Sequence, residues 1–213
     1  CPTESPEHFT DLLRSCIISS SKFDLRAEEE CKEIKHVYSA SQLREPGLKF
    51  KVNPNKGLLD LTYSSEDVLT MPILNKHDNT EMFFRNIVAF EHCHFPYNQK
   101  IITEYLKILD FLIDTEKDVN VLVDNKIIAN WMGDANAVAT MANSLSTNLQ
   151  MPHFNPEYFS LCNSLNDFYG NSRNKFGYLH TRVLQHSLEN IIATVLLLLM
   201  LIQTICSITL LFQ

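Results

Sequence analysis

The sequence predicts a mainly α-helical domain with one small β-hairpin, joined to a single C-terminal transmembrane helix. Three observations support this fold class. Between residues 78 and 170, apolar side chains recur every three or four positions, which is typical of amphipathic helices. Only residues 58–74 alternate apolar and polar side chains as paired strands do. No Lys, Arg, Asp or Glu occurs from Asn190 to Gln213.

The composition indicates a packed domain and argues against two classes of function. The chain has 213 residues, of which 45% are hydrophobic and 20% are charged, so we expect a hydrophobic core. The formal net charge of -7, without a stripe of Lys and Arg, argues against nucleic-acid binding. With five glycines and no glycine-rich phosphate-binding motif, a nucleotide site is not expected either.

The N-terminal part predicts one helix and a charged connection. The helix covers Pro6–Ile18, and nine charges within Lys22–Lys35 then indicate a solvated helix or connector. Ser39 is placed to cap the next short helix, which ends at a Pro46-Gly47 turn. The apolar stripe of the first helix is formed by Phe9, Leu12, Leu13, Cys16 and Ile17.

The only β element predicted is a hairpin. Residues 58–63 form its first strand and Val68–Leu74 its second, with a turn at SSED between them. Pro72 lacks a backbone N–H, which restricts the second strand to a sheet edge.

Helices are predicted for the rest of the domain. The first of them buries Met82, Phe83, Ile87 and Phe90 and stops at Pro96; the second covers Ile101–Asp114 and buries Ile102, Tyr105, Leu106, Leu109 and Leu112. Val119–Val123 and Ile127–Trp131 are predicted as a short helical pair. Asp134 and Asn155 cap two further helices, which bury Val138, Met141 and Leu145, and Phe159, Cys162, Leu165, Phe168 and Tyr169.

The C-terminal segment predicts a membrane span over residues 191–212. At 1.5 Å per residue its 22 residues reach about 33 Å, enough for a hydrocarbon core of about 30 Å. Arg173, Lys175 and Arg182 precede the span without an acidic neighbour, so we expect the bulk of the chain in the cytosol and the C-terminus outside or in a lumen, the plasma membrane being favoured. The same three side chains are candidates for contact with lipid head groups.

These patterns divide the chain into four parts. Residues 1–37 are an N-terminal helix and connector, 38–170 the helical domain, 171–190 a basic juxtamembrane segment and 191–212 the transmembrane helix. Gln203 lies near the middle of the span and Ser207 one turn later. Because an amide in the bilayer favours a partner helix, both are candidates for self-association or pairing within the membrane.

The segment FFRNIVAFEHCHFP, residues 83–96, resembles the plant DUF247 family, also called UPF0481. The resemblance extends in order through ASQLREPGLKFK, LLDLTY, VLTMPIL, FLIDTEKDVNVLVDNKIIANWMGD and LLLLMLIQTICSI, over roughly residues 38–212. It implies a mostly helical, membrane-associated plant protein of a family with no established enzymatic activity. Some members of the family resemble pollen-side determinants of self-incompatibility, and others are linked to development or stress.

Cysteine and histidine residues supply the alternative hypothesis. Glu91-His92-Cys93-His94 holds zinc-ligand side chains, but neighbours on a helix project about 100° apart and do not close on one ion. His77, His153 and Cys162 are candidates for additional metal ligands, and Cys93 or Cys162 beside a histidine is the candidate Cys–His nucleophile. The simpler expectation is that Cys93 is buried between polar faces of its helix. Asp110 and Asp114, four residues apart, more simply form a solvated face, and Trp131 fills the core.

The preferred prediction is a non-enzymatic, membrane-anchored plant protein for protein–protein recognition or signalling, without a cofactor, metal or catalytic residue. Its expected partners are the lipid bilayer, an unknown protein and a second copy through the transmembrane helix, but no nucleic acid. The alternatives are a membrane-tethered Cys/His hydrolase or metal-dependent enzyme, and a truncated copy without function.

Overall fold

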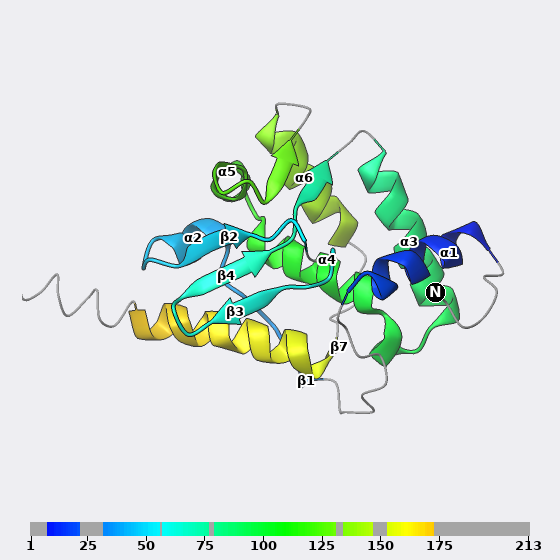
Figure 1. Ribbon diagram of the computed structural model, residues 1–213, viewed down its shortest axis with the longest axis horizontal. Coiled ribbons are helices and arrows are strands. Elements are labelled where there is room, and N and C mark those ends of the chain that lie inside the picture. The colour runs from blue at the N-terminus through cyan, green and yellow to red at the C-terminus, as the bar shows by residue number, and fades with distance from the viewer. Residues whose placement is uncertain are drawn as a thin grey trace, which may run out of the picture. The chain divides into compact units, whose positions relative to one another are not determined.

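The computed structural model describes residues 8–21, 32–55, 57–76, 79–130, 134–146 and 153–172 (Figure 1). The helices within these ranges are α1 (Phe9–Ser19), α2 (Ala40–Arg44), α3 (Thr80–His94), the 3₁₀ helix η1 (Tyr97–Gln99), α4 (Ile101–Leu112), α5 (Glu116–Asp124) and α6 (Ala135–Ser146). The chain is also helical over 156–172. The strands are β1 (Lys32–Glu33), β2 (Lys49–Val52), β3 (Thr62–Ser64), β4 (Val68–Met71), β5 (Leu74–Lys76), β6 (Ile128–Asn130) and β7 (His153–Phe154).

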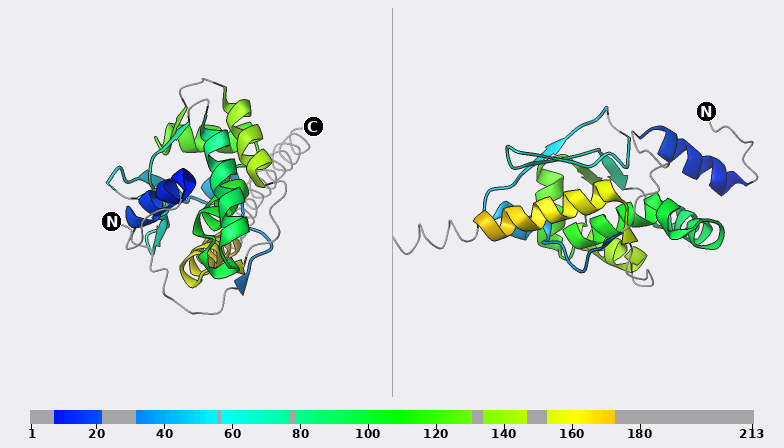
Figure 2. Two further views of the ribbon diagram at one scale, coloured as in Figure 1. Left: turned by 90° about the vertical axis from the view of Figure 1, so that its right-hand side faces the viewer. Right: turned by 90° about the horizontal axis from the view of Figure 1, so that it is seen from below.

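The core is built around α4. Nine of its twelve residues are buried, including every side chain that the sequence places on its inner face, so this prediction is confirmed. A helix that is apolar on most of its circumference must be covered on several sides. Helices α3 and α6 pack against α4. Figures 1 and 2 show the helix over 156–172 alongside the three-stranded sheet, and the hydroxyl of Tyr158 donates to the carbonyl of Leu59 at 2.7 Å.

Several helices begin where the sequence places a cap. Ser39 starts α2 in a capping box with Gln42, whose side-chain oxygen accepts the Ser39 N–H at 3.0 Å. Asp134 accepts the N–H of Asn136 at 2.9 Å, and Asn155 accepts that of Tyr158 at 3.0 Å. Each side chain satisfies a backbone donor that has no partner inside its own helix.

The prediction that a hairpin is the only β element is wrong, because the described residues form three small sheets. The hairpin of β3 and β4 exists, but β2 pairs in parallel with the other side of β4. Strand β4 is therefore central, not an edge, and Pro72 follows its last residue. Phe50 of β2 is buried while Lys49 and Lys51 are exposed, a pattern that keeps an edge strand from pairing further.

The helix predicted over Ile127–Trp131 is also wrong in the part that the structure describes. Residues 128–130 form β6, which pairs in parallel with β5, while Trp131 lies outside the described residues. Lys126 has φ 61, a left-handed conformation that turns the chain after α5. Ile127, just before the strand, and Ile128, its first residue, are both buried. The third sheet pairs β1 with β7 in antiparallel orientation.

The buried faces of α1 and α3 differ from the predicted stripes. Helix α3 buries Thr80, Phe84, Ile87 and Glu91, whereas Met82 is 61% exposed. Helix α1 buries Arg14 and Ile18, whereas most of its predicted stripe faces outward. Each helix therefore buries a charged side chain together with apolar ones, Arg14 with Ile18 in α1 and Glu91 with Phe84 and the predicted Ile87 in α3.

The predicted transmembrane helix is not part of the fold that the structure describes, which corrects the fold class. Among the described residues, no helix combines the length and the apolar character needed to cross a membrane. The span predicted over 191–212 lies outside these residues, as do Arg173, Lys175, Arg182, Gln203 and Ser207.

Candidate functional site

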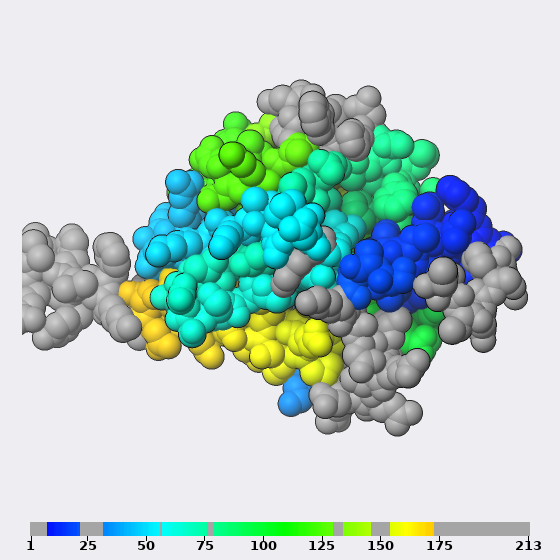
Figure 3. Space-filling view, viewed as in Figure 1, coloured from blue at the N-terminus to red at the C-terminus, as the bar shows by residue number. Residues whose placement is uncertain are grey.

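Helix α1 presents apolar side chains to the surface. Phe9 is 74% exposed and Leu12 39% exposed, and Cys16 is exposed one turn further on. Positions 9, 12 and 16 follow the spacing of one helix face. We call these three residues the outer face of α1. Figure 3 shows α1 (blue) on the surface of the molecule.

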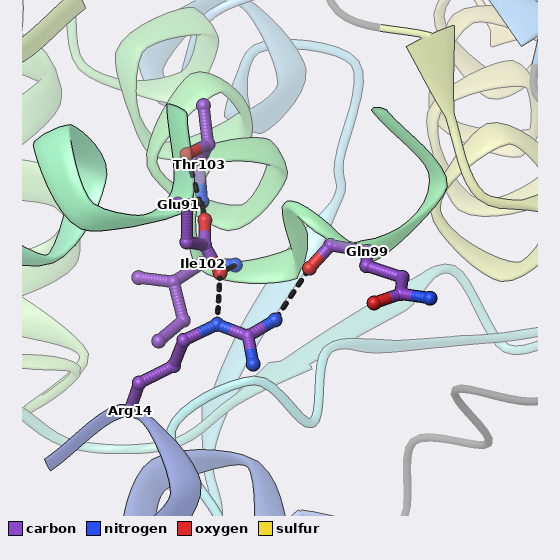
Figure 4. Close-up of polar contacts among 5 residues, drawn as sticks. All are labelled: Arg14, Glu91, Gln99, Ile102 and Thr103. Atoms are coloured by element: carbon purple, nitrogen blue, oxygen red, sulfur yellow. Dashed lines mark hydrogen bonds and ion pairs between the residues drawn. The ribbon is translucent and has the colours of Figure 1, made fainter. Parts of the chain in front are cut away.

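Arg14, on another side of α1, holds the helix to the rest of the fold. Its side chain is 6% exposed, and its Nε donates to Oε1 of Glu91 at 3.0 Å. Its Nη2 donates to the carbonyl oxygen of Gln99 at 2.5 Å, and the guanidinium lies 3.7 Å from the ring centroid of Phe95. Figure 4 shows Arg14 reaching from α1 towards Glu91 and Gln99.

Glu91 also caps the first turn of α4. Its Oε2 accepts the N–H of Thr103 at 2.9 Å and the hydroxyl of the same residue at 2.7 Å, while Oε1 accepts the N–H of Ile102 at 3.3 Å (Figure 4). A carboxylate is favoured at the positive end of a helix dipole. We call this arrangement the Arg14–Glu91 clasp. It joins α1, α3 and α4 by charge, and the buried Ile18 adds an apolar contact, so α1 is docked without burial of Phe9 or Leu12.

Glu104 is a second buried carboxyl group in α4. Its Oε2 accepts both the backbone N–H of Asn155 at 2.9 Å and the side-chain amide of Asn155 at 2.6 Å, while Oε1 has no hydrogen-bond partner within the described residues. Burial raises the pKa of Glu104 to about 8, against the lowering effect of the Asn155 hydrogen bonds, and the charge of Glu91 adds to the rise. The Glu104 side chain is therefore largely protonated at neutral pH.

Asp118 of α5, in contrast to Glu104, is an ionised carboxylate at neutral pH. Burial alone would raise its pKa, but hydrogen bonds from the backbone N–H of Ser41 and from the hydroxyls of Ser39, Ser41 and Thr115 lower it to about 2. The carboxylate is charged at all physiological pH values. It links α2 to the start of α5.

Within the part of the chain that the structure describes, no cysteine forms the Cys–His pair that the hydrolase hypothesis requires. Cys93, expected to be buried, is exposed, and no hydrogen bond to a histidine is found for it among the described residues. Cys162 is buried, and burial raises the pKa of its thiol to about 12, so it is not a nucleophile at neutral pH. Within the same described ranges, no three His, Cys, Asp or Glu side chains are grouped to hold a metal ion. That the chain is not an enzyme stays a prediction.

We expect Cys162 to react with iodoacetamide at least about tenfold more slowly than Cys93 in the folded protein, since only the exposed and ionised thiol reacts. Peptide-resolved mass spectrometry after a short alkylation pulse measures both sites at once. In denaturant the two rates should converge. Equal rates in the native protein would contradict the burial of Cys162.

Asp110 and Asp114 do not act as a carboxylate pair. Asp110 forms an ion pair with Lys107, with 2.6 Å between Oδ2 and Nζ, and Asp114 is exposed. His77, Trp131 and the side chain of His153 lie outside the described residues, so the structure does not test their predicted roles.

Comparison with known proteins identifies the family. The model of the DUF247 family, described as plant proteins of unknown function, matches residues 1–206. The chain belongs to the DUF247 family. The match begins at residue 1, so the N-terminal segment, which lay outside the resemblance seen in the sequence, is also part of the DUF247 region.

Two curated UPF0481 proteins of Arabidopsis thaliana are similar to this DUF247 chain. At3g02645 is 26% identical over 114 residues, which cover 53% of this chain and 21% of the relative. At3g47200 is 30% identical over 120 residues, which cover 55% of this chain and 25% of the relative. The aligned part spans about a quarter or less of these relatives. No solved structure matches the chain.

Proposed function

We propose that this DUF247 chain is a non-catalytic recognition unit that binds a partner protein through the outer face of α1. One observation carries the proposal: α1 is docked by a buried arginine while Phe9 and Leu12 stay exposed. Grouped apolar side chains on a surface are typical of interaction sites, and aromatic residues are enriched there.

The spacing of the outer face favours a protein partner over a small molecule. Side chains at the first, fourth and eighth positions of a helix face are those with which a helix enters the groove of another protein. The Arg14–Glu91 clasp supports this role because it orients the helix before binding, which lowers the entropic cost of association.

The test is the double variant Phe9→Ser/Leu12→Ser. Neither side chain carries the docking of α1, so we expect a folded protein that loses partner binding by about tenfold or more, the effect typical of a central interface residue. Affinity co-purification from plant extract followed by quantitative mass spectrometry measures the loss, and sedimentation of the same proteins distinguishes a second copy from a different partner.

Met82→Ser is the matched control, because Met82 is an exposed apolar side chain of α3 and not of the outer face of α1. It should retain the partners of the parent chain. If the double variant retains them at the same yield, the outer face of α1 is not the recognition surface.

A further inference from the structure

A groove of about 440 Å³ lies between α2 and α5. Val121 forms part of its lining and is buried, while the neighbouring Asn120 is exposed. The groove is distinct from the outer face of α1, since no residue of α1 lines it. We refer to it as the α2–α5 groove.

The walls of the α2–α5 groove are fixed to each other. The Asp118 carboxylate of α5 accepts the backbone N–H of Ser41 in α2 at 2.8 Å and the N–H and hydroxyl of Thr115 at 2.9 and 2.8 Å. These bonds hold at neutral pH because Asp118 is charged there. The groove is therefore formed in advance, and a ligand does not have to order its walls.

Two exposed ion pairs lie across the groove, one with its basic residue on α2 and the other with its basic residue on α5. Arg44 of α2 pairs with Asp124 of α5 at 3.5 Å, and Lys117 of α5 pairs with Glu45 at the end of α2 at 3.4 Å. All four side chains are more than half exposed. Exposed pairs of this kind contribute little to stability, so their charges are readily exchanged for those of a ligand.

The groove offers a ligand one charge of each sign at a defined separation. Lys117 and Asp124 are seven residues apart on α5, about 10.5 Å along the helix axis. Asn120 lies between them and carries both a donor and an acceptor. A segment in the extended polyproline II conformation rises about 9 Å over three residues, which is one full turn, so side chains three positions apart lie on the same side of it. An acidic and a basic side chain three positions apart thus match Lys117 and Asp124, while the Asn120 amide matches the backbone between them.

We propose that the α2–α5 groove binds an extended segment of a partner protein that carries an acidic and a basic side chain three residues apart. The acidic side chain pairs with Lys117 and the basic one with Asp124, which replaces the two ion pairs seen across the groove. This site is independent of the outer face of α1, so either proposal stands if the other fails.

The probes are three blocked hexapeptides added to the full isotope-labelled chain. The first has the sequence Ala-Glu-Ala-Ala-Lys-Ala, the second exchanges Glu and Lys, and the third has Gln at both positions. We expect amide NMR shifts at Asn120 and Val121 with a charged peptide, a loss of affinity as salt is raised, and no shifts with the Gln peptide. Absence of shifts at these amides with both charged peptides overturns the proposal.

A charge exchange supplies the second test. Lys117→Glu combined with Glu45→Lys keeps an ion pair across the groove but places a negative charge at both ends of this face of α5. The variant should bind a Lys-Ala-Ala-Lys peptide more tightly than either mixed peptide, by about tenfold. Exchanging Glu81 and Arg85, an exposed pair in α3, is the matched control and should leave the preference unchanged. An unaltered preference in the groove variant also overturns the proposal.

Discussion

Replacing Glu91 with alanine is expected to lower the free energy of unfolding by about 3–5 kcal/mol, the cost of leaving a buried charge without its partner. The Arg14 guanidinium would stay buried without a carboxylate, and the first amides of α4 would lose their acceptor. Replacing Arg14 with methionine should cost clearly less. Glu91 then retains two N–H donors and the Thr103 hydroxyl, which compensate its charge.

Urea unfolding of the two single variants and the double variant measures this asymmetry, and the cycle gives the coupling between the side chains. Glu66→Ala, an exposed position in the hairpin turn, is the control and should stay within about 0.5 kcal/mol of the parent. Equal losses for Glu91→Ala and Arg14→Met would mean that Glu91 does not act as the cap of α4.

The same pair of variants separates the docking of α1 from the integrity of the core. Hydrogen exchange in Arg14→Met should become faster in α1, because its main buried anchor is gone, while α4 amides stay protected. In Glu91→Ala, exchange should rise in both helices. This difference follows from the position of Glu91 between α1 and α4 (Figure 4).

Local patterns in the sequence predict much of the helical structure. The buried residues of α4 and the caps at Ser39, Asp134 and Asn155 all depend on contacts within a few residues. Such contacts are encoded in spacing and in the donor and acceptor groups of neighbouring side chains. The family resemblance rests on similarly local motifs, and the family match confirms it.

The sequence predicts the hairpin of β3 and β4 but not the other strand pairings, because those depend on partners far away in the chain. Strand β5 and strand β6 are three residues each and more than 50 residues apart, and a short apolar run such as Ile127-Ile128 fits a helix equally well. The parallel pairing of β2 with β4 has no turn signal, since only antiparallel neighbours can be joined by a tight turn.

The sequence predicts that the outer face of α1 is buried, for a related reason: the contact that orients α1 also joins distant parts of the chain. A stripe of apolar residues is predicted to face the core, yet in α1 the inward face carries Arg14, paired with Glu91, and Ile18. One signal was available: Thr80, Phe84, Ile87 and Glu91 share one helix face, and Glu91 extends an otherwise buried row. In α1, Arg14 is the one basic residue within the apolar helix sequence, and it is the cation that pairs with Glu91.

The stability of the folded chain is expected to fall between about pH 4.5 and pH 8 through the titration of Glu104. Its pKa is about 8 when folded, against an ordinary value of 4.5. Between these values the folded state keeps a proton that the unfolded state has lost. The stabilisation is therefore complete below pH 4.5 and decreases by at most about 1.4 kcal/mol per pH unit as the pH rises through 8.

Glu104→Gln tests this linkage because glutamine keeps an acceptor oxygen for Asn155 but does not titrate. The difference in unfolding free energy between the parent and this variant should shift in favour of the variant as the pH rises from 5 to 8. Taking the difference cancels the other titrating groups, including Glu91, whose charge near Glu104 is common to both proteins. Urea unfolding at several pH values measures it. A difference that does not change with pH would mean that Glu104 is already charged in the core, and then the unpartnered Oε1 would need a cation or water beside it.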